Sequence, residues 1–206
     1  MYLTKIEIDL ANNSGYRAAL WDSQKMHKLV SGFFDAQRKD AGILFCKSIT
    51  GMVMSLYMYS QIPVLSDRLL PGMNLAAQRD LSSWIDNLKA GQKFGFRLLT
   101  MPFKKVGAEG VKNSRRKALD TAEERLSWLG RKSQQGGFMI LSVNEISDEK
   151  INVRHPSEKG GSMIMNTWQY TGFLQITDTE LFRKTLCCGI GPGKAYGLGM
   201  LVLSRG

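Results

Sequence analysis

The chain offers few groups for acid–base chemistry near neutral pH, because it contains only two histidines, His27 and His155. On a helix that turns roughly 100° per residue, His27 lies at the edge of an apolar stripe that runs from Met26 to Phe33. An imidazole at such an edge is half shielded, keeps a pKa near neutrality and still reaches a substrate. His27 could therefore act as a general acid or base, although the residues alone favour a structural or surface role. His155 lies in the polar segment RHPSEKGG, which is typical of a solvated loop.

A second unusual feature is the segment GIGPGKAYGLG, in which five glycines fall within residues 189–199. It is one residue too short for a phosphate-binding P-loop, and Ala195 follows Lys194 where a hydroxyl would be needed. It also leaves a predicted helix and enters a strand, the reverse of a dinucleotide-binding turn. Bare backbone N–H groups beside Lys194 would suit a phosphodiester. A plain helix-to-strand turn is the alternative, but it needs only one or two glycines, so close approach to a partner is favoured.

Other catalytic patterns are missing from the sequence. No cysteine or histidine spacing indicates a zinc site, and no carboxylate cluster indicates a magnesium site. No Ser-His-Asp arrangement stands out either. If the protein cleaves nucleic acid, we therefore expect metal-free chemistry without a cofactor. Such chemistry is far easier on RNA, whose 2′-OH is an internal nucleophile.

Composition is compatible with a polyanionic partner and equally with a merely soluble basic protein. Against 18 acidic residues the 206-residue chain has 28 lysines and arginines, a formal net charge of +10. Three cysteines, two of them adjacent, make a poor disulfide framework and indicate a reducing, cytoplasmic setting. The first ten residues carry three charges and do not resemble a signal peptide. No run of about 18 apolar residues is present, so we expect no membrane-spanning segment.

Hydrophobic periodicity predicts a βαββαβ order in the first half of the chain. The predicted elements are a strand over 2–10, a helix over 23–40 with Ser23 as N-cap, hairpin strands over 42–48 and 52–60, a helix over 81–91 and a strand over 93–101. This order is typical of the ferredoxin-like fold.

The second half predicts a similar order after a basic linker over 104–120. Its elements are a helix over 121–137, a strand over 138–146, one or two strands over 162–178, a helix over 178–189 and a strand over 195–204. The first strand of this second repeat is hard to see in the linker. We therefore predict an α+β protein of two tandem ferredoxin-like (RRM-like) domains, at 1–104 and 105–206.

Several segments, in order from end to end, carry a resemblance to a known family. They are MYLTKIEI, MHKLVSGFF, FGFRLLTMP followed by Lys104-Lys105, TAEERLSWLGRK, and YTGFLQITDTELFRKTLCCGIGPGKAYGLGMLVLS. The most specific pattern is G-I-G-x-x-K-x-x-G-x-G near the C-terminus, followed by the histidine on the first helix with its aromatic pair. Together they resemble the CasE family, the CRISPR repeat endoribonucleases of the type I-E Cascade complex.

The resemblance implies an activity and partners. It implies metal-independent cleavage of the CRISPR precursor transcript at the base of the repeat hairpin. The products would carry 2′,3′-cyclic phosphate and 5′-hydroxyl ends, and the enzyme would stay on the mature guide. The implied partners are the repeat RNA hairpin and other Cascade subunits, with no small-molecule cofactor and no membrane.

The resemblance also implies site residues. His27 takes the position of the family's catalytic histidine, as base or acid, and Lys159 is the nearest match to its assisting lysine. Some relatives have a tyrosine three residues before the histidine, where this chain has Gln24. The expected RNA-binding residues are Lys112, Arg115, Arg116, Lys117, Arg131, Arg154, Gly191, Gly193, Lys194 and Gly197.

One alternative of another class is a catalytically silent, RNA-hairpin-binding subunit of a CRISPR ribonucleoprotein complex on the same fold. His27 favours the nuclease, because a silent relative would have no need of it, whereas Gln24 favours the silent subunit. A nucleotide-dependent enzyme is excluded by the mismatch with both glycine patterns.

Overall fold

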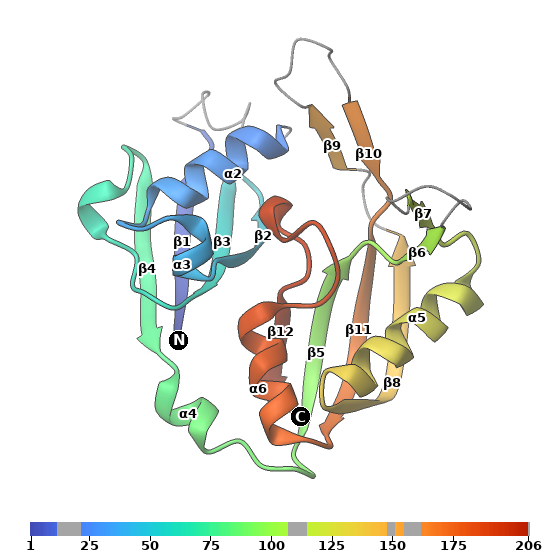
Figure 1. The fold of residues 1–206 in the computed structure, drawn as a ribbon. Helices are drawn as coiled ribbons and strands as arrows, with labels where there is room; N and C mark the ends of the chain where they lie inside the picture. The colour runs from blue at the N-terminus through green and yellow to red at the C-terminus, as the bar shows by residue number, and fades with distance from the viewer. Residues whose placement is uncertain (12–21, 107–114, 148–150, 155–161, 206) are drawn as a thin grey trace.

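The computed structural model describes residues 1–11, 22–106, 115–147, 151–154 and 162–205. It contains two four-stranded antiparallel sheets, and helices cover one face of each (Figure 1). Each sheet has its own apolar core on its helix-covered face.

The first sheet has the strand order β2-β3-β1-β4. Its strands are β1 (Tyr2–Asp9), β2 (Leu44–Thr50), β3 (Val53–Ser60) and β4 (Met73–Asp80). The alternation predicted for β1 is confirmed, because Ile6 and Ile8 are fully buried while their chain neighbours are half-buried.

Helix α2 (Ser23–Gly32) packs on this sheet through Met26 and Val30, which are buried. Ser23 is the first residue of the helix and not its N-cap, so the helix begins one residue earlier than predicted. The carboxylate of Asp22, rather than Ser23, accepts hydrogen bonds from the backbone N–H groups of Gln24 (2.9 Å) and Lys25 (3.2 Å). The helix ends at Gly32, and a separate turn, α3 (Arg38–Ala41), follows.

The second sheet has the order β12-β5-β11-β8. Its strands are β5 (Lys93–Thr100), β8 (Phe138–Ser147), β11 (Trp168–Ile176) and β12 (Leu201–Arg205). It is covered by α5 (Ala122–Gln135) and α6 (Thr179–Cys188). Two small hairpins accompany it, β6 (Phe103–Val106) with β7 (Arg115–Ala118), and β9 (Ile151–Arg154) with β10 (Ser162–Met165).

One predicted pairing is wrong. The strand predicted over 93–101 to close the first domain is β5, and it pairs with β11 and β12 of the second sheet. Strand β5 is therefore the first strand of the second repeat, which could not be identified in the linker over 104–120. The first sheet is closed instead by β4, whose mostly exposed residues show no apolar alternation. The helix predicted over 81–91 shrinks to α4 (Ser82–Asp86).

With this exchange both sheets have the same topology. Numbered in chain order within each half, the strands of both sheets lie in the order 4-1-3-2, which is the ferredoxin-like arrangement. The predicted fold class is therefore confirmed. Because β5 belongs to the second sheet, we propose that the domains divide within residues 81–92, instead of after residue 104.

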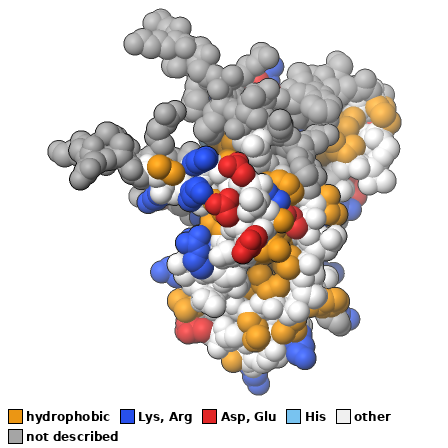
Figure 2. All heavy atoms as spheres, turned by 90° about the vertical axis from the view of Figure 1, so that its right-hand side faces the viewer, with side chains coloured by type: hydrophobic (Ala, Val, Ile, Leu, Met, Phe, Trp, Pro, Cys, Tyr) orange, Lys and Arg blue, Asp and Glu red, His pale blue; other side chains and the backbone are white. Residues whose placement is uncertain are grey.

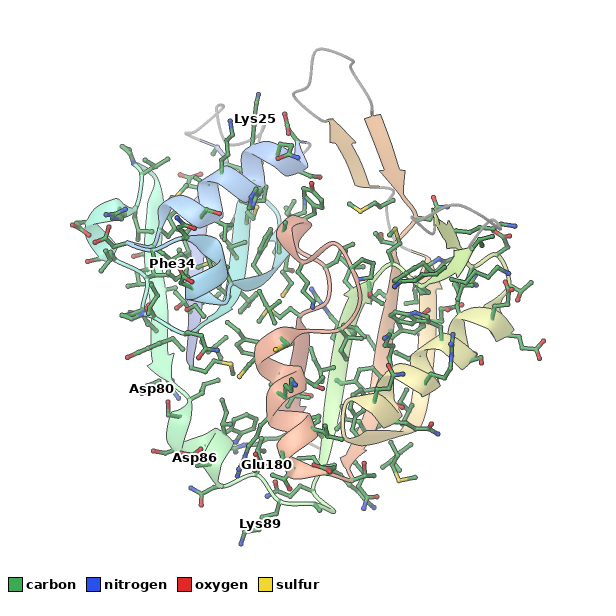
Figure 3. The ribbon with its side chains drawn as sticks, in the orientation of Figure 1. Lys25, Phe34, Asp80, Asp86, Lys89 and Glu180 are labelled. Atoms are coloured by element: carbon green, nitrogen blue, oxygen red, sulfur yellow. The ribbon has the colours of Figure 1, made fainter. Side chains whose placement is uncertain are left out.

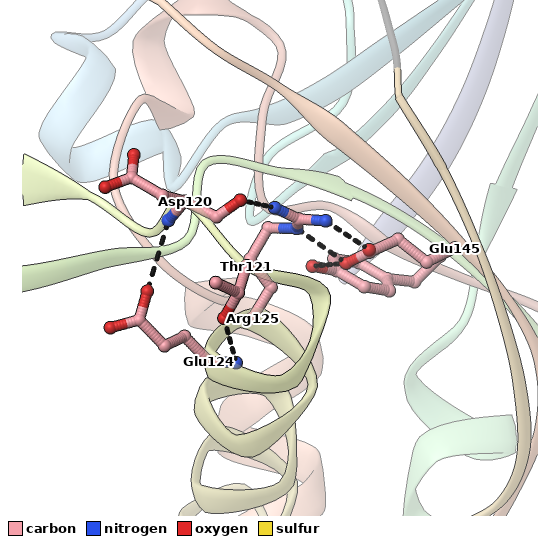
Figure 4. Close-up of polar contacts among 6 residues, drawn as sticks. Asp120, Thr121, Glu124, Arg125 and Glu145 are labelled. Carbon is pink, nitrogen blue, oxygen red and sulfur yellow. Dashed lines mark hydrogen bonds and ion pairs between the residues drawn. The ribbon is translucent and has the colours of Figure 1, made fainter.

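A buried ionic network ties α5 to the second sheet (Figure 4). The Arg125 guanidinium donates to both carboxylate oxygens of Glu145 (3.0 and 2.8 Å) and lies 3.4 Å from the centroid of the Trp168 ring. The Tyr170 hydroxyl donates to the same carboxylate (2.8 Å). Burial, and then this hydrogen bond, raise the pKa of Tyr170 far above its usual range. The phenol therefore stays protonated as a donor.

The glycine-rich segment packs the second domain against the first. Gly189, Gly191, Gly193, Gly197 and Gly199 all have positive φ. A Cβ on Gly197 (φ +85°) would lie 2.9 Å from the Phe45 ring, and one on Gly189 would lie 2.9 Å from Leu44. Both neighbours belong to β2, so the missing side chains let this loop approach the first domain. The predicted close approach has a partner within the protein itself.

Around this contact the open faces of the two sheets meet. Leu44, Cys46 and Tyr59 of the first sheet form a buried cluster with Met200, and Val202 of β12 packs against it. Burial raises the pKa of the Cys46 thiol. The two domains therefore share an apolar interface in addition to the glycine contacts.

We predict that Glu145→Gln lowers the free energy of unfolding by about 3 kcal/mol, because it leaves a buried guanidinium without its counter-charge. Urea unfolding measures this. Lys104→Met, which breaks the exposed Lys104–Glu124 pair, is the control and should leave the free energy of unfolding almost unchanged. Equal losses for the two variants would contradict the prediction.

Gly197→Ala is expected to destabilise the protein by about 2 kcal/mol, since it adds a Cβ at positive φ against Phe45. Gly130→Ala is the matched control. Gly130 lies inside α5 with open space around the added Cβ, so the same change should stabilise the protein by about 0.5–1 kcal/mol. Thermal unfolding of both variants checks the opposite signs, and a stable Gly197→Ala protein would refute the packing role.

Candidate functional site

His27 lies on α2 where that helix meets the second domain. Helix α2 contacts β9 and the short 3₁₀ helix η2 (Lys194–Tyr196) of the glycine-rich loop. The His27 side chain is half-buried and its Nδ1 atom is buried. The predicted edge position is therefore confirmed. What the sequence could not predict is that the helix carrying this edge contacts the other domain.

The glycine-rich loop is fixed by its own backbone. Ile190 N–H donates to the carbonyl of Gly199 (2.8 Å), and Gly199 N–H donates to the carbonyl of Leu99 in β5 (2.7 Å). Within the loop, Tyr196 N–H donates to the carbonyl of Gly193 (2.8 Å). These hydrogen bonds fix the backbone of the loop at both ends and at its turn. The backbone positions of Lys194 and Tyr196 are therefore defined.

Tyr196 joins the loop to α2 across the domain boundary. The Gln24 side-chain amide donates to the Tyr196 hydroxyl at 3.1 Å. The Tyr196 ring packs against Met165 and Leu198 of the second domain. Sequence reasoning missed Tyr196, because its only signal was an aromatic residue inside a loop that was read for its glycines. A phenol does lie beside residue 24, but it comes from the other domain.

A cavity of about 360 Å³ opens beside the loop. It is lined by Lys132 at the end of α5, Thr185 on α6, and Gly191 and Lys194 of the loop. The Lys132 ammonium donates to Gln135 at the rim (3.0 Å). The Thr185 hydroxyl donates to the carbonyl of Gly136 (3.1 Å), so the two lysines and the bare backbone are what make this cavity suited to an anion such as a phosphate. Lys132 joins Lys194 here, although it was not among the predicted site residues.

The other predicted basic residues either do not line this cavity or lie outside the described residues. Arg131 and Lys117 are exposed, and Lys117 lies 3.8 Å from Asp120. Lys112, Lys159 and His155 lie outside the described residues, as do the side chains of Arg115, Arg116 and Arg154 on β7 and β9.

On the side of the molecule that carries β8, basic and acidic side chains are interspersed (Figure 2). Lys104 pairs there with Glu124 at 2.8 Å, and this hydrogen bond raises the pKa of the lysine. The basic linker therefore has acidic neighbours that its sequence alone did not reveal, which reduces the positive charge on this face.

The hairpin β9–β10 rises beside α2, on the end of the molecule where Lys25 projects (Figures 1 and 3). Lys89 marks the opposite end (Figure 3). The histidine helix, the glycine-rich loop and this hairpin are thus adjacent, and together they form the candidate site.

Two further observations concern the described residues. Among them, no cluster of three histidine, cysteine or acidic side chains could hold a metal ion. Within the same ranges, no helix is both long and apolar enough to cross a membrane.

Comparison with a curated protein supports the resemblance. The CRISPR-associated endoribonuclease Cse3 of Thermus thermophilus is 37% identical over 123 residues. That alignment spans 55% of this chain and 56% of the relative, so it covers about half the length of each.

Solved structures match along the whole chain. A structure of CRISPR endoribonuclease Cse3 bound to a 19-nucleotide RNA superimposes with a TM-score of 0.84 at 26% identity, covering 100% of both chains. A chain of a pre-nicking CRISPR RNA-guided surveillance complex superimposes with a TM-score of 0.74, also at 26% identity and 100% coverage of both. The family model described as CRISPR associated protein matches residues 1–205. The chain therefore belongs to this CRISPR-associated protein family, as its resemblance to CasE predicted.

Proposed function

We propose that this protein is a metal-independent endoribonuclease that cuts CRISPR precursor transcripts at the base of the repeat hairpin and stays bound to the mature guide. The observation that carries the proposal is the contact between α2, the helix that carries His27, and the glycine-rich loop of the second domain, part of which lines the anion-suited cavity. The name of the Thermus relative supports the class of reaction.

The reaction uses the RNA as its own nucleophile. The 2′-oxygen upstream of the cut forms a bond to phosphorus, and the bond from phosphorus to the 5′-oxygen breaks. The 2′-OH loses a proton and the leaving oxygen gains one, so the products are a 2′,3′-cyclic phosphate and a 5′-hydroxyl. His27 carries out one of these proton transfers, a contribution of about 10²–10⁴-fold. Because the nucleophile belongs to the substrate, no metal-activated water is needed.

The second domain would hold the phosphates. Lys194 and Lys132 line the cavity beside the loop, and their charges would stabilise the negative charge that grows on the phosphorane. Lys159 remains the proposed assisting lysine. The remaining RNA contacts are proposed at Gly191, Gly193 and Gly197 of the loop and at the basic residues of the two hairpins and α5.

The likeness to a chain of a surveillance complex supports a second element of the proposal, that the protein works as one subunit of such an assembly. The alternative of a silent RNA-binding subunit is favoured by Gln24, since a phenol at that position is missing from the helix itself. The Tyr196 hydroxyl beside Gln24 weakens this alternative.

We expect His27→Ala to abolish cleavage of the host's own repeat hairpin, with at least a 10²-fold loss in the single-turnover rate constant, because the proton transfer loses its catalyst. The assay is run with excess EDTA on labelled RNA. Hairpin affinity should stay within about twofold.

A hairpin with a 2′-deoxy sugar at the cut site is the control, and the wild type should bind it without cutting. A wild type that binds the hairpin tightly and never cuts would favour the silent subunit. Cleavage of the deoxy substrate, or cleavage lost in EDTA, would contradict the mechanism.

Lys194→Met should weaken hairpin binding roughly tenfold at moderate salt and lower the slope of log affinity against log salt by about one, as expected for one lost phosphate contact. Lys89→Met is the matched control, because it removes the same charge from the opposite end of the molecule (Figure 3). Filter binding over a salt series measures both. Equal slopes for the two variants would contradict the phosphate role of the loop.

A further inference from the structure

The hydrogen bond between Gln24 and Tyr196 joins two elements that the chain order keeps far apart. Gln24 lies on the first turn of α2 in the first domain, and Tyr196 ends the short helix in the glycine-rich loop of the second. The Gln24 amide nitrogen lies 3.1 Å from the Tyr196 hydroxyl oxygen. This hydrogen bond therefore links the helix of the first domain directly to the loop of the second.

Both partners of this bond are fixed from their own side. Gln24 N–H is bound to the Asp22 carboxylate (2.9 Å), which starts the helix. The Tyr196 ring packs against Met165 and Leu198, and its backbone N–H is bound within the loop (2.8 Å). The ring that carries the hydroxyl is thus anchored in the second domain, and the backbone that carries the Gln24 side chain is anchored in the first.

His27 lies one turn after Gln24 on the same face of the helix, because residues three apart are neighbours there. A bond that holds Gln24 therefore also holds the turn that carries the imidazole. Lys194 is two residues before Tyr196 in the same 3₁₀ helix, so the bond links the imidazole and the cavity lysine through two short rigid segments.

We propose that Tyr196 is a positioning residue for the cleavage reaction, which acts through Gln24 to hold His27 in register with the phosphate held by the glycine-rich loop. This inference rests on the proposed nuclease function and adds to it a residue from the second domain. It separates two roles of the loop, in which the lysine binds RNA and the tyrosine aligns the catalyst. Reaction rates depend steeply on such alignment.

The test is a double-mutant cycle with Tyr196→Phe and Gln24→Met. The first removes only the hydroxyl and keeps the ring, and the second keeps the length of the side chain and suits a helix. Each variant should lower the single-turnover rate constant at saturating enzyme about tenfold. The double variant should be no slower than the slower single variant, because both remove the same bond.

Two further measurements separate positioning from a general structural role. The affinity for the 2′-deoxy hairpin should stay within about twofold of wild type, and the thermal unfolding midpoint should be unchanged. Tyr2→Phe is the matched control. Tyr2 starts β1 and pairs with Asp80, at the end of the first sheet away from Lys25 of α2 (Figure 3), and its variant should cleave at the wild-type rate.

Additive losses in the double variant would overturn the inference, as would a wild-type rate for Tyr196→Phe. A rate loss that is fully explained by weaker hairpin binding would also overturn it, since alignment acts after binding. If the wild type does not cleave at all, the proposed function fails first and the inference falls with it. If the wild type and Tyr196→Phe cleave at the same rate, the inference is wrong and the proposed function still stands.

Discussion

The contact on which the rest of the structure depends is the approach of the glycine-rich loop to strand β2. At Gly189 and Gly197 an added Cβ would lie 2.9 Å from Leu44 and Phe45, so this approach is possible only without side chains. The conformational entropy that so many glycines cost is offset by a close interface between two domains. The sequence had suggested that the glycines allow close approach to a ligand, whereas in the structure they allow close approach to the first domain.

This interface creates a composite site. The first domain contributes an imidazole on a helix edge, and the second contributes lysines, a phenol and bare backbone. Among the described residues, the imidazole comes from the first half of the chain, and the lysines that line the cavity come from the second. Under the proposed function, acid–base chemistry and anion binding would be coupled through the packing of the two domains, to which the apolar cluster around Cys46 and Met200 belongs.

The elements were largely predictable from the sequence, whereas their partners were not. Local patterns predicted β1, α2, α5 and α6, and α5 is capped by Thr121, whose hydroxyl accepts from Glu124 N–H. Strand β5 was predicted correctly but placed in the wrong sheet, since strand pairing is decided by distant segments. Strand β4 was missed, because its exposed residues carry no apolar period.

The half-buried position of His27 was predictable from helical periodicity, and its catalytic role is implied by the resemblance, whereas Tyr196 became visible only when α2 and the loop were seen together. The central claim, one RNA site built from both domains, is tested most directly by the structure of the protein bound to a hairpin with a 2′-deoxy sugar at the cut site. The account predicts the scissile phosphate within hydrogen-bonding distance of the His27 imidazole, with the adjacent backbone against Lys194. A hairpin held by the second domain alone, with its cut site away from α2, would contradict it.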